Sequence, residues 1–532
     1  MDSILELFNF RKRTILYYIL ALISTLLLIR ILSPFYFYGL VNLFSAHRTI
    51  WFPTILTLLS LSLIFWAYVM LEDIDDDLIR FTTDKKDDEN KNRKIEKQLR
   101  VLKRLGGLGI LVGIALLMVA PSLNGYYSKV AYLDNLAVTS GSEVELPARI
   151  PYQVALKRAS NSLASSSVSS YDVTNTDKGM TALTVARGGL FGSQPYANVV
   201  ESDGVNCNFV TQYARARIGG TFNGNLQKKI VRKFGNLQMN SLNTWAYCKN
   251  GAPMVIIPVT KYHHPSIFIT ISKPAGVVSY NGKTGKLTYV KNVGPGQFPG
   301  PSYPLSIASL QREAMMVLNQ NNNKPQGYFN FITNKFGWVS TESIIDDPNQ
   351  GNPTELTFNL NEGSYYSTPL VVKGSSTAYS GRADLNGSAV NFGEFNPITL
   401  VKFTQPLQSG SVTVSEIKRA FPSIGWETKM EVYEIYPAST TTLRGSIGSQ
   451  NAVSLQLLIT LKDKNYIYCL FSVDQSEKIC ASADKPIRST DPFESSKGSV
   501  SVANPLRALT ALSREELLTL LTQLTNELKR RG

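Results

Sequence analysis

Three long apolar runs stand at the start of the chain, and the remainder alternates apolar and polar positions over short stretches. The runs cover residues 14–32, 51–71 and 105–123. Each is close to the ~20 residues that an α-helix needs to cross the hydrocarbon core of a bilayer. Buried core helices are the alternative, although such runs are uncommon in soluble folds. The pattern therefore predicts a membrane domain of three transmembrane helices within residues 1–123.

Basic residues around these runs predict the orientation of the helices. Three precede the first run, and the loop of residues 72–104 contains ten: Arg80, Lys85, Lys86, Lys91, Arg93, Lys94, Lys97, Arg100, Lys103 and Arg104. Because cytoplasmic loops carry an excess of Lys and Arg, we expect the N-terminus and this loop in the cytoplasm. The chain after residue 123 then lies outside, as part of a multi-pass protein of the cytoplasmic membrane.

Small residues inside the third run predict close helix packing. Gly109 and Gly113 form a GxxxG pattern, which lets another helix approach closely. The partner is either another helix of this chain or a second copy. Residues 95–105 also place leucine and isoleucine at helical spacing among basic residues, which fits a helix on the inner leaflet or a solvated stalk.

The outer region reads as strand-rich α+β. Strands are predicted at residues 254–259, 267–271, 430–436, 454–461 and 466–473, and a hairpin at 277–290. Helices are predicted at residues 151–163, 304–318 and 414–421. A Pro/Gly-rich segment, 294–304, is typical of a linker. We therefore expect two extracytoplasmic α+β regions, 124–293 and 305–500.

All four cysteines lie in the outer region, which suits an oxidising compartment. Cys469 and Cys480 flank a predicted turn and would face one another across a hairpin. Cys207 and Cys248 remain for a second bridge. Reduced, buried cysteines are the alternative. We therefore expect two disulfides.

The last segment, residues 501–532, predicts an amphipathic helix. Ser513 and Glu516 form a capping box. The apolar stripe that follows consists of Leu517, Leu521, Leu524 and Leu528. This stripe either docks on its own domain or meets a partner helix, and it is short for a coiled coil.

Charge is unevenly divided along the chain. The net charge of +14 splits into +3 for residues 1–123 and +11 for the remainder, which has 39 basic and 28 acidic residues. A possible anion-binding patch comprises Arg215, Arg217, Lys228, Lys229, Arg232 and Lys233. Its partner could be an anionic wall polymer, lipid headgroups or a nucleic acid, and an ordinary solvated surface is the alternative.

Catalytic and cofactor motifs are absent from the sequence. None of HExxH, paired CxxC, GxSxG or a P-loop occurs. The adjacent His263 and His264 would point to opposite faces of a strand and chelate a metal poorly. We therefore identify no metal, cofactor or soluble small-molecule substrate. Two carboxylates in a cleft would nevertheless leave no linear signature.

These features favour a non-enzymatic binding or scaffold subunit of a cell-envelope complex, of the kind used in secretion, conjugation or phage-encoded assembly. The expected partners are membrane lipids and other membrane or envelope proteins, or a second copy of the chain. A membrane-tethered hydrolase acting on envelope polymers is one alternative. A transmembrane sensor with an outer ligand-binding domain is another.

Overall fold

The structure is a computed structural model of the 532-residue chain. It describes residues 20–80, 86–140, 146, 152, 168–186, 195–201, 204–220, 224–333, 337–340, 356–360, 363–373, 379–407, 415, 418–419, 430–438, 454–461, 466–471, 478–482 and 485–488. Residues 70–96 and 430–488 are described by their backbone alone. The predicted helices at 151–163 and 414–421 fall almost wholly outside these ranges, and the tail at 501–532 entirely so.

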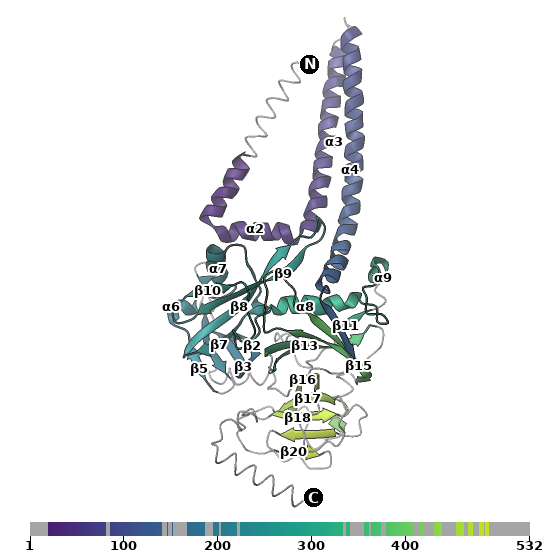
Figure 1. The fold of residues 1–532 in the computed structure, drawn as a ribbon. Helices are drawn as coiled ribbons and strands as arrows, with labels where there is room; N and C mark the ends of the chain where they lie inside the picture. Colours follow the sequence, from purple (N-terminus) through teal and green to yellow (C-terminus); the bar gives the residue numbers. More distant parts are fainter. Residues whose placement is uncertain are drawn as a thin grey trace, which may run out of the picture.

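Long helices project from one side of a strand-rich body (Figure 1). Two stretches of the described chain, Arg48–Val69 and Lys97–Tyr132, are long and apolar enough to cross a membrane. They belong to α3 (Arg48–Arg80) and α4 (Lys86–Tyr132), which run side by side as a helical hairpin. A shorter apolar helix, Leu20–Leu32, precedes them.

The segment between the first two apolar runs is helical. Helix α2 (Pro34–Ala46) begins directly after Ser33 and in Figure 1 runs from the lower end of the apolar N-terminal helix to the start of α3. Pro34 stands at the first helical position, where its missing N–H costs no hydrogen bond. From the sequence, no helix is predicted at these residues.

The described residues of the body form four sheets. The central sheet has the order β10-β9-β8-β6 with β7 also on β8, and comprises β6 (Gln238–Met239), β7 (Trp245–Lys249), β8 (Ala252–His263), β9 (Ile271–Asn281) and β10 (Leu287–Val290). The amino-terminal sheet comprises β2 (Val168–Thr176), β3 (Gly179–Ala186), β4 (Tyr196–Glu201) and β5 (Asn206–Asn208) in that order.

The mixed sheet runs β1-β15-β14-β13-β11 with β12 on β13, and comprises β1 (Leu136–Ser140), β11 (Trp338–Ser340), β12 (Leu356–Leu360), β13 (Gly363–Val372), β14 (Tyr379–Asn386) and β15 (Ile398–Leu407). The carboxy-terminal sheet comprises β16 (Met430–Ala438), β17 (Ser454–Leu461), β18 (Tyr466–Phe471), β19 (Lys478–Ser482) and β20 (Lys485–Arg488) in that order.

Short helices connect and cover these sheets. They are α6 (Thr211–Ala214), α7 (Leu226–Phe234), α8 (Leu305–Ala314) and α9 (Tyr328–Ile332), with single 3₁₀ turns η2 (Ser241–Asn243) and η3 (Met315–Val317). Asn225 caps α7 by accepting a hydrogen bond from the Lys228 backbone N–H at 3.1 Å. The helix predicted at 304–318 corresponds to α8 followed by η3.

Two hydrophobic cores hold the body together. One lies between the central and amino-terminal sheets and includes Val199, Ile230 and Val255. The other joins the end of α4 to β8, α8 and the mixed sheet. The parallel pairing of β1 with β15 fixes the mixed sheet directly after α4. The expectation of apolar N-terminal helices followed by a strand-rich region with a disulfide is therefore confirmed.

Most predicted strands agree with the structure, with one exception. The hairpin at 277–290 is present, with Leu287 opposite Tyr280. The predicted strand at 267–271 is wrong except for Ile271, where β9 begins. Its apolar Phe268 instead packs on Phe52 of α3, with ring centroids 5.9 Å apart. From the sequence pattern alone, an apolar residue that packs on another element cannot be distinguished from one on the buried face of a strand.

The Pro/Gly-rich segment 294–304 passes between the central and mixed sheets. Its Tyr303 is fully buried, and the backbone N–H groups of Ser302 and Tyr303 both donate to the Gly387 carbonyl, at 2.8 and 3.0 Å. The Trp245 indole N–H donates to the Pro301 carbonyl at 2.8 Å. The two halves of the body therefore share buried structure here, and the domain boundaries at this segment stay a prediction.

Candidate functional site at the base of the helical hairpin

The helical hairpin is fastened to the body by side chains near the end of α4. The Tyr126 hydroxyl donates to the Gln326 carbonyl at 2.6 Å, and the Tyr132 hydroxyl accepts from the Ser272 backbone N–H at 2.9 Å. Tyr126 and Tyr132 are also buried in the core that includes α8 and the mixed sheet. Because α4 is helical without a break up to this core, body and hairpin form a continuous structure.

A second set of contacts lies beside the first. The Asn124 side-chain oxygen accepts from the Thr270 backbone N–H at 2.8 Å, and the Thr270 hydroxyl donates to the Ser45 carbonyl at 3.3 Å. The start of β9 is thereby tied to both α4 and the end of α2. The His264 ring also hydrogen-bonds to the Thr270 hydroxyl at 3.1 Å. Burial, aided by Arg48 and His263, lowers the pKa of His264, so this ring is neutral at pH 7.

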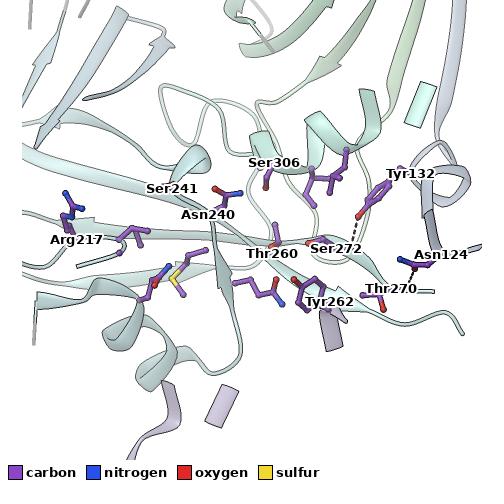
Figure 2. Close-up of a pocket in the computed structure, with 18 residues that line it drawn as sticks. Asn124, Tyr132, Arg217, Asn240, Ser241, Thr260, Tyr262, Thr270, Ser272 and Ser306 are labelled. Carbon is purple, nitrogen blue, oxygen red and sulfur yellow. Dashed lines mark hydrogen bonds between the residues drawn. The ribbon is translucent and has the colours of Figure 1, made fainter. Parts of the chain in front are cut away.

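A groove of about 740 Å³ opens at this junction (Figure 2). Its lining is dominated by neutral amide and hydroxyl side chains from α4, α7, η2, α8 and the strands β6, β8 and β9, and α2 contributes Ala46. The lining residues are Ala46, Asn124, Tyr132, Arg217, Ile218, Gly219, Gln227, Gln238, Met239, Asn240, Ser241, Thr260, Tyr262, Thr270, Ser272, Ser306, Ile307 and Leu310. Figure 2 shows Arg217 at one end and Asn124 with Thr270 at the other.

Two features of the lining favour a groove that binds a ligand over a gap that is filled by side chains of the protein itself. The Gln238 side-chain amide nitrogen is buried and has no hydrogen-bond partner in the structure. A buried donor in this state is costly unless a ligand or solvent atom satisfies it. Arg217 supplies a single positive charge to an otherwise neutral surface. The groove therefore suits a hydroxyl- or amide-rich ligand with an acidic group at one end.

Asp172 on β2 interacts electrostatically with Arg217, which lies at one end of the groove. Burial raises the pKa of this carboxyl to about 7, although the nearby Arg217 guanidinium acts in the opposite direction. Tyr196 lies in the same cluster, and its hydroxyl accepts from the Ile218 backbone N–H at 3.3 Å. Burial and the neighbouring Asp172 raise the pKa of Tyr196. The charge beside Arg217 therefore changes near neutral pH.

The six residues of the predicted anion-binding patch fall into two places. Lys228, Lys229, Arg232 and Lys233 lie on α7, whereas Arg215 follows α6 and Arg217 lines the groove. Lys229, Arg232, Lys233 and Arg215 are exposed to solvent. The patch is therefore a basic helix with two arginines outside it, Arg215 exposed after α6 and Arg217 in the groove.

The basic helix is attached to α2. The Lys228 ammonium donates to the Tyr36 hydroxyl at 3.3 Å and lies 5.0 Å from the centre of that ring. It also lies 5.6 Å from the centre of the Phe35 ring. On the other side of α7, the Lys233 ammonium donates to the Leu287 carbonyl at 2.9 Å. These contacts hold α7 between α2 and β10.

The predicted glycine pair faces α3 of the same chain. A Cβ atom built on Gly109 would collide with the Ser60 hydroxyl, and one on Gly113 with the Thr57 hydroxyl. One on Gly106 would lie 2.6 Å from Ile64 Cγ1. The sequence left open whether another helix of this chain or a second copy packs against these glycines. In the structure, α3 of this chain packs against them.

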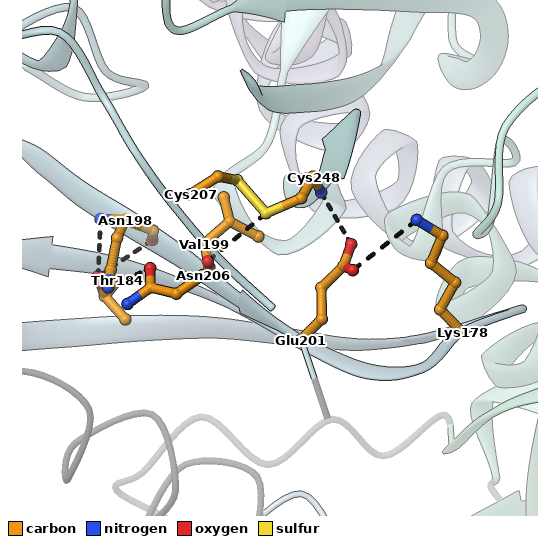
Figure 3. Close-up of a disulfide and its surroundings, with 8 residues drawn as sticks. All are labelled: Lys178, Thr184, Asn198, Val199, Glu201, Asn206, Cys207 and Cys248. Atoms are coloured by element: carbon orange, nitrogen blue, oxygen red, sulfur yellow. Dashed lines mark hydrogen bonds and ion pairs between the residues drawn. A yellow bond between two sulfur atoms is a disulfide. The ribbon is translucent and has the colours of Figure 1, made fainter. Parts of the chain in front are cut away.

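One of the two predicted disulfides is present. Cys207 on β5 and Cys248 on β7 are bonded, with their Cα atoms 6.0 Å apart (Figure 3). The Cys248 backbone N–H donates to the buried Glu201 carboxylate at 2.8 Å, and Lys178 approaches the same carboxylate at 3.8 Å. The bridge thereby ties the amino-terminal sheet to the central sheet.

The structure does not test the predictions for the remaining site residues. Cys469 and Cys480 stand directly opposite one another on β18 and β19, as the hairpin argument expects. Their side chains are not among those described, so this bridge stays a prediction. Leu517, Leu521, Leu524 and Leu528 lie outside the described residues altogether.

Within the described part of the chain, no group of three or more His, Cys, Asp or Glu side chains could hold a metal ion. Comparison with family models, with curated proteins and with solved structures finds no match for this chain. The groove had no local signature in the sequence, because its lining is drawn from positions 46 to 310.

Proposed function

We propose that this chain is a membrane-anchored extracytoplasmic binding and scaffold subunit of a cell-envelope complex. In this proposal α3, α4 and the apolar helix before α2 cross the cytoplasmic membrane. The N-terminus and the basic segment 72–104 face the cytoplasm, in accordance with the distribution of Lys and Arg. The Cys207–Cys248 disulfide supports an oxidising compartment for the body.

The observation that carries the proposal is the rigid junction between hairpin and body. Three side chains of α4, Asn124, Tyr126 and Tyr132, hydrogen-bond to the body, and two of them are buried in its core. A body attached in this way holds its groove at a constant height and angle to the membrane. A tethered hydrolase that scans a polymer would gain from a flexible connection, whereas a subunit that positions a partner gains from a stiff one.

One feature also favours a sensor as a second candidate. Helix α4 contains 47 residues, which corresponds to about 70 Å at 1.5 Å per residue. It runs from the basic loop into the core beside the groove. Ligand binding at the groove could therefore shift α4 and change the exposure of the loop, which contains no signalling motif and would need a partner.

Purification of the full-length protein from its native membrane in mild detergent tests the proposal. We expect integral envelope proteins in fixed stoichiometry, and their loss when Asn240→Arg and Ser241→Arg fill the rim of the groove. A control variant, Lys249→Gln, changed at the end of β7 and outside the groove lining, should retain them. Release of fragments from purified envelope polymer by the protein alone would instead support the hydrolase.

A further inference from the structure

We propose that the basic helix α7, held beside α2, binds anionic phospholipid headgroups on the outer face of the membrane that anchors the chain. This inference deepens the proposed function and rests on the orientation given there. It assigns one partner to a patch that the sequence left open between lipid, wall polymer and nucleic acid.

The position of α7 is the first argument. Helix α2 begins at Pro34, directly after the apolar helix Leu20–Leu32, so it lies where the chain leaves the bilayer. Figure 1 shows α7 beside α2, on the side of the body from which the long helices project. The hydrogen bond from Lys228 to Tyr36 fixes this arrangement.

The composition of α7 is the second argument. Leu226, Ile230 and Val231 are buried against the central sheet, and the other face carries the basic side chains. No acidic residue occurs in the nine residues of this helix. Lysine and arginine at a membrane surface attract anionic headgroups, and arginine can bind a phosphate through two parallel N–H donors. The helix therefore presents an unopposed positive face beside the membrane.

The aromatic contacts distinguish a lipid from a soluble polyanion. Tyrosine and tryptophan are typical of the layer between hydrocarbon and headgroups, and lysine stems pack on them while the ammonium reaches polar groups. The Lys228 ammonium itself lies over the rings of Phe35 and Tyr36, as a cation–π contact beside the tyrosine hydroxyl. A long polymer track would also need Arg215 and Arg217, which precede α7. The Arg217 carbonyl accepts from the Leu226 backbone N–H at the start of α7 at 2.8 Å, but the Arg217 side chain lines the groove instead of extending the basic face.

The test uses the full-length protein in mild detergent. Native mass spectrometry would measure binding of phosphatidylglycerol and, separately, of neutral phosphatidylcholine. We compare the wild type with Lys229→Gln/Arg232→Gln, and with Lys249→Gln/Lys283→Gln as a control of equal charge at the opposite ends of β8 and β9. All four side chains are exposed, so both variants should fold, and an unchanged melting temperature would verify this.

We expect the wild type and the control to prefer phosphatidylglycerol, and the α7 variant to bind it about tenfold more weakly. The preference should also decrease as salt is raised. Equal binding of the two lipids by the wild type, or equal phosphatidylglycerol binding by both variants, would overturn the inference. Displacement of the lipid by a short soluble polyphosphate at comparable concentration would assign the patch to an anionic polymer instead.

The failure of this inference is distinguishable from failure of the proposed function. Resistance of the protein to extraction from membranes at alkaline pH reports insertion independently of α7. Reporter fusions report orientation in the same way. A protein that is inserted with its body outside but shows no lipid preference would refute the lipid contact alone.

Discussion

At the scale of single residues, Asp172 shows how position controls charge. Its pKa is raised to about 7 because burial penalises the carboxylate more than Arg217 favours it. In the unfolded chain the same group ionises near pH 4. The folded protein therefore binds the proton more tightly than the unfolded one. Asp172 lowers the stability wherever it is ionised in the unfolded chain, and the full loss is reached above its folded-state pKa.

The sign of this effect gives a pH-dependent prediction. Replacing Asp172 with Asn should raise the free energy of unfolding relative to the wild type above pH 7. The difference should shrink as the pH falls through 7 and disappear below about pH 4, where Asp172 is protonated in both states. A shift of this size corresponds to at most about 4 kcal/mol. Melting temperatures of both proteins between pH 4 and 8 measure it, and a difference that does not vary with pH would contradict the assignment.

The Cys207–Cys248 bridge gives a second prediction at this scale. The bonded cysteines are 41 residues apart, and closing a loop of that length stabilises a fold by about 4 kcal/mol in the chain-entropy model. Cys207→Ala with Cys248→Ala should lower the melting temperature, and reduction of the wild type should do the same. An unchanged transition in both cases would show that the bridge contributes little beyond the packing around it.

At the scale of elements, the glycines of α4 explain how the helical hairpin packs. Gly106 faces the Ser60 carbonyl and Ile64 side chain of α3, and Gly113 faces Thr57. Without side chains, the two backbones approach closely, which is the main source of association between helices in lipid. Gly107, by contrast, has no atom within 4 Å of the position where a Cβ would stand.

We expect Gly106→Ala with Gly113→Ala to destabilise the protein in detergent by about 1–3 kcal/mol, because the added methyl groups overpack the interface. Thermal denaturation of the full-length protein would show this as a lower transition temperature. The control, Gly107→Ala with Gly125→Ala, adds the same two methyl groups where there is open space. It should be neutral or slightly stabilising, since alanine is the better helix former. Equal loss in both variants would mean that α3 is not the partner of this face.

At the scale of the whole molecule, the junction makes the body and the long helices one mechanical unit. Contacts from Asn124, Tyr126 and Tyr132 reach β9 and the loop before α9. A partner bound in the groove would therefore be held at a set distance from the anchoring helices. This fixed distance serves the proposed scaffold function only if the body lies on the outer side of the cytoplasmic membrane.

The orientation is testable with two fusions. A reporter enzyme that is active only outside the cytoplasm should be active after Gly532 and inactive after Asn90. The physical reason is the concentration of basic residues within residues 72–104, which include Asn90, since basic segments beside a transmembrane helix are retained in the cytoplasm. Activity after Asn90 with silence after Gly532 would reverse the orientation and remove the basis for both the scaffold and the lipid contact.

Several features of this fold follow from the sequence alone. The apolar runs, the strands at 254–259 and 454–461 and the hairpin at 277–290 were all predictable, because burial repeats locally with the period of each element. The Cys207–Cys248 pair followed by elimination once Cys469 and Cys480 were assigned to a hairpin. The basic residues of α7 could be recognised as a cluster because they lie close together along the chain.

The candidate site was decided by tertiary structure. Lys228 and Tyr36 are 192 residues apart, and Tyr126 and Gln326 are 200 apart, so no local pattern records that they meet. Which helix receives the glycine face, and which side of the body carries α7, depend on how several elements fill space together. The amino-acid sequence determined the elements because each depends on neighbours within a few residues. The groove and the placement of the basic helix beside α2 exist only where distant elements pack against one another.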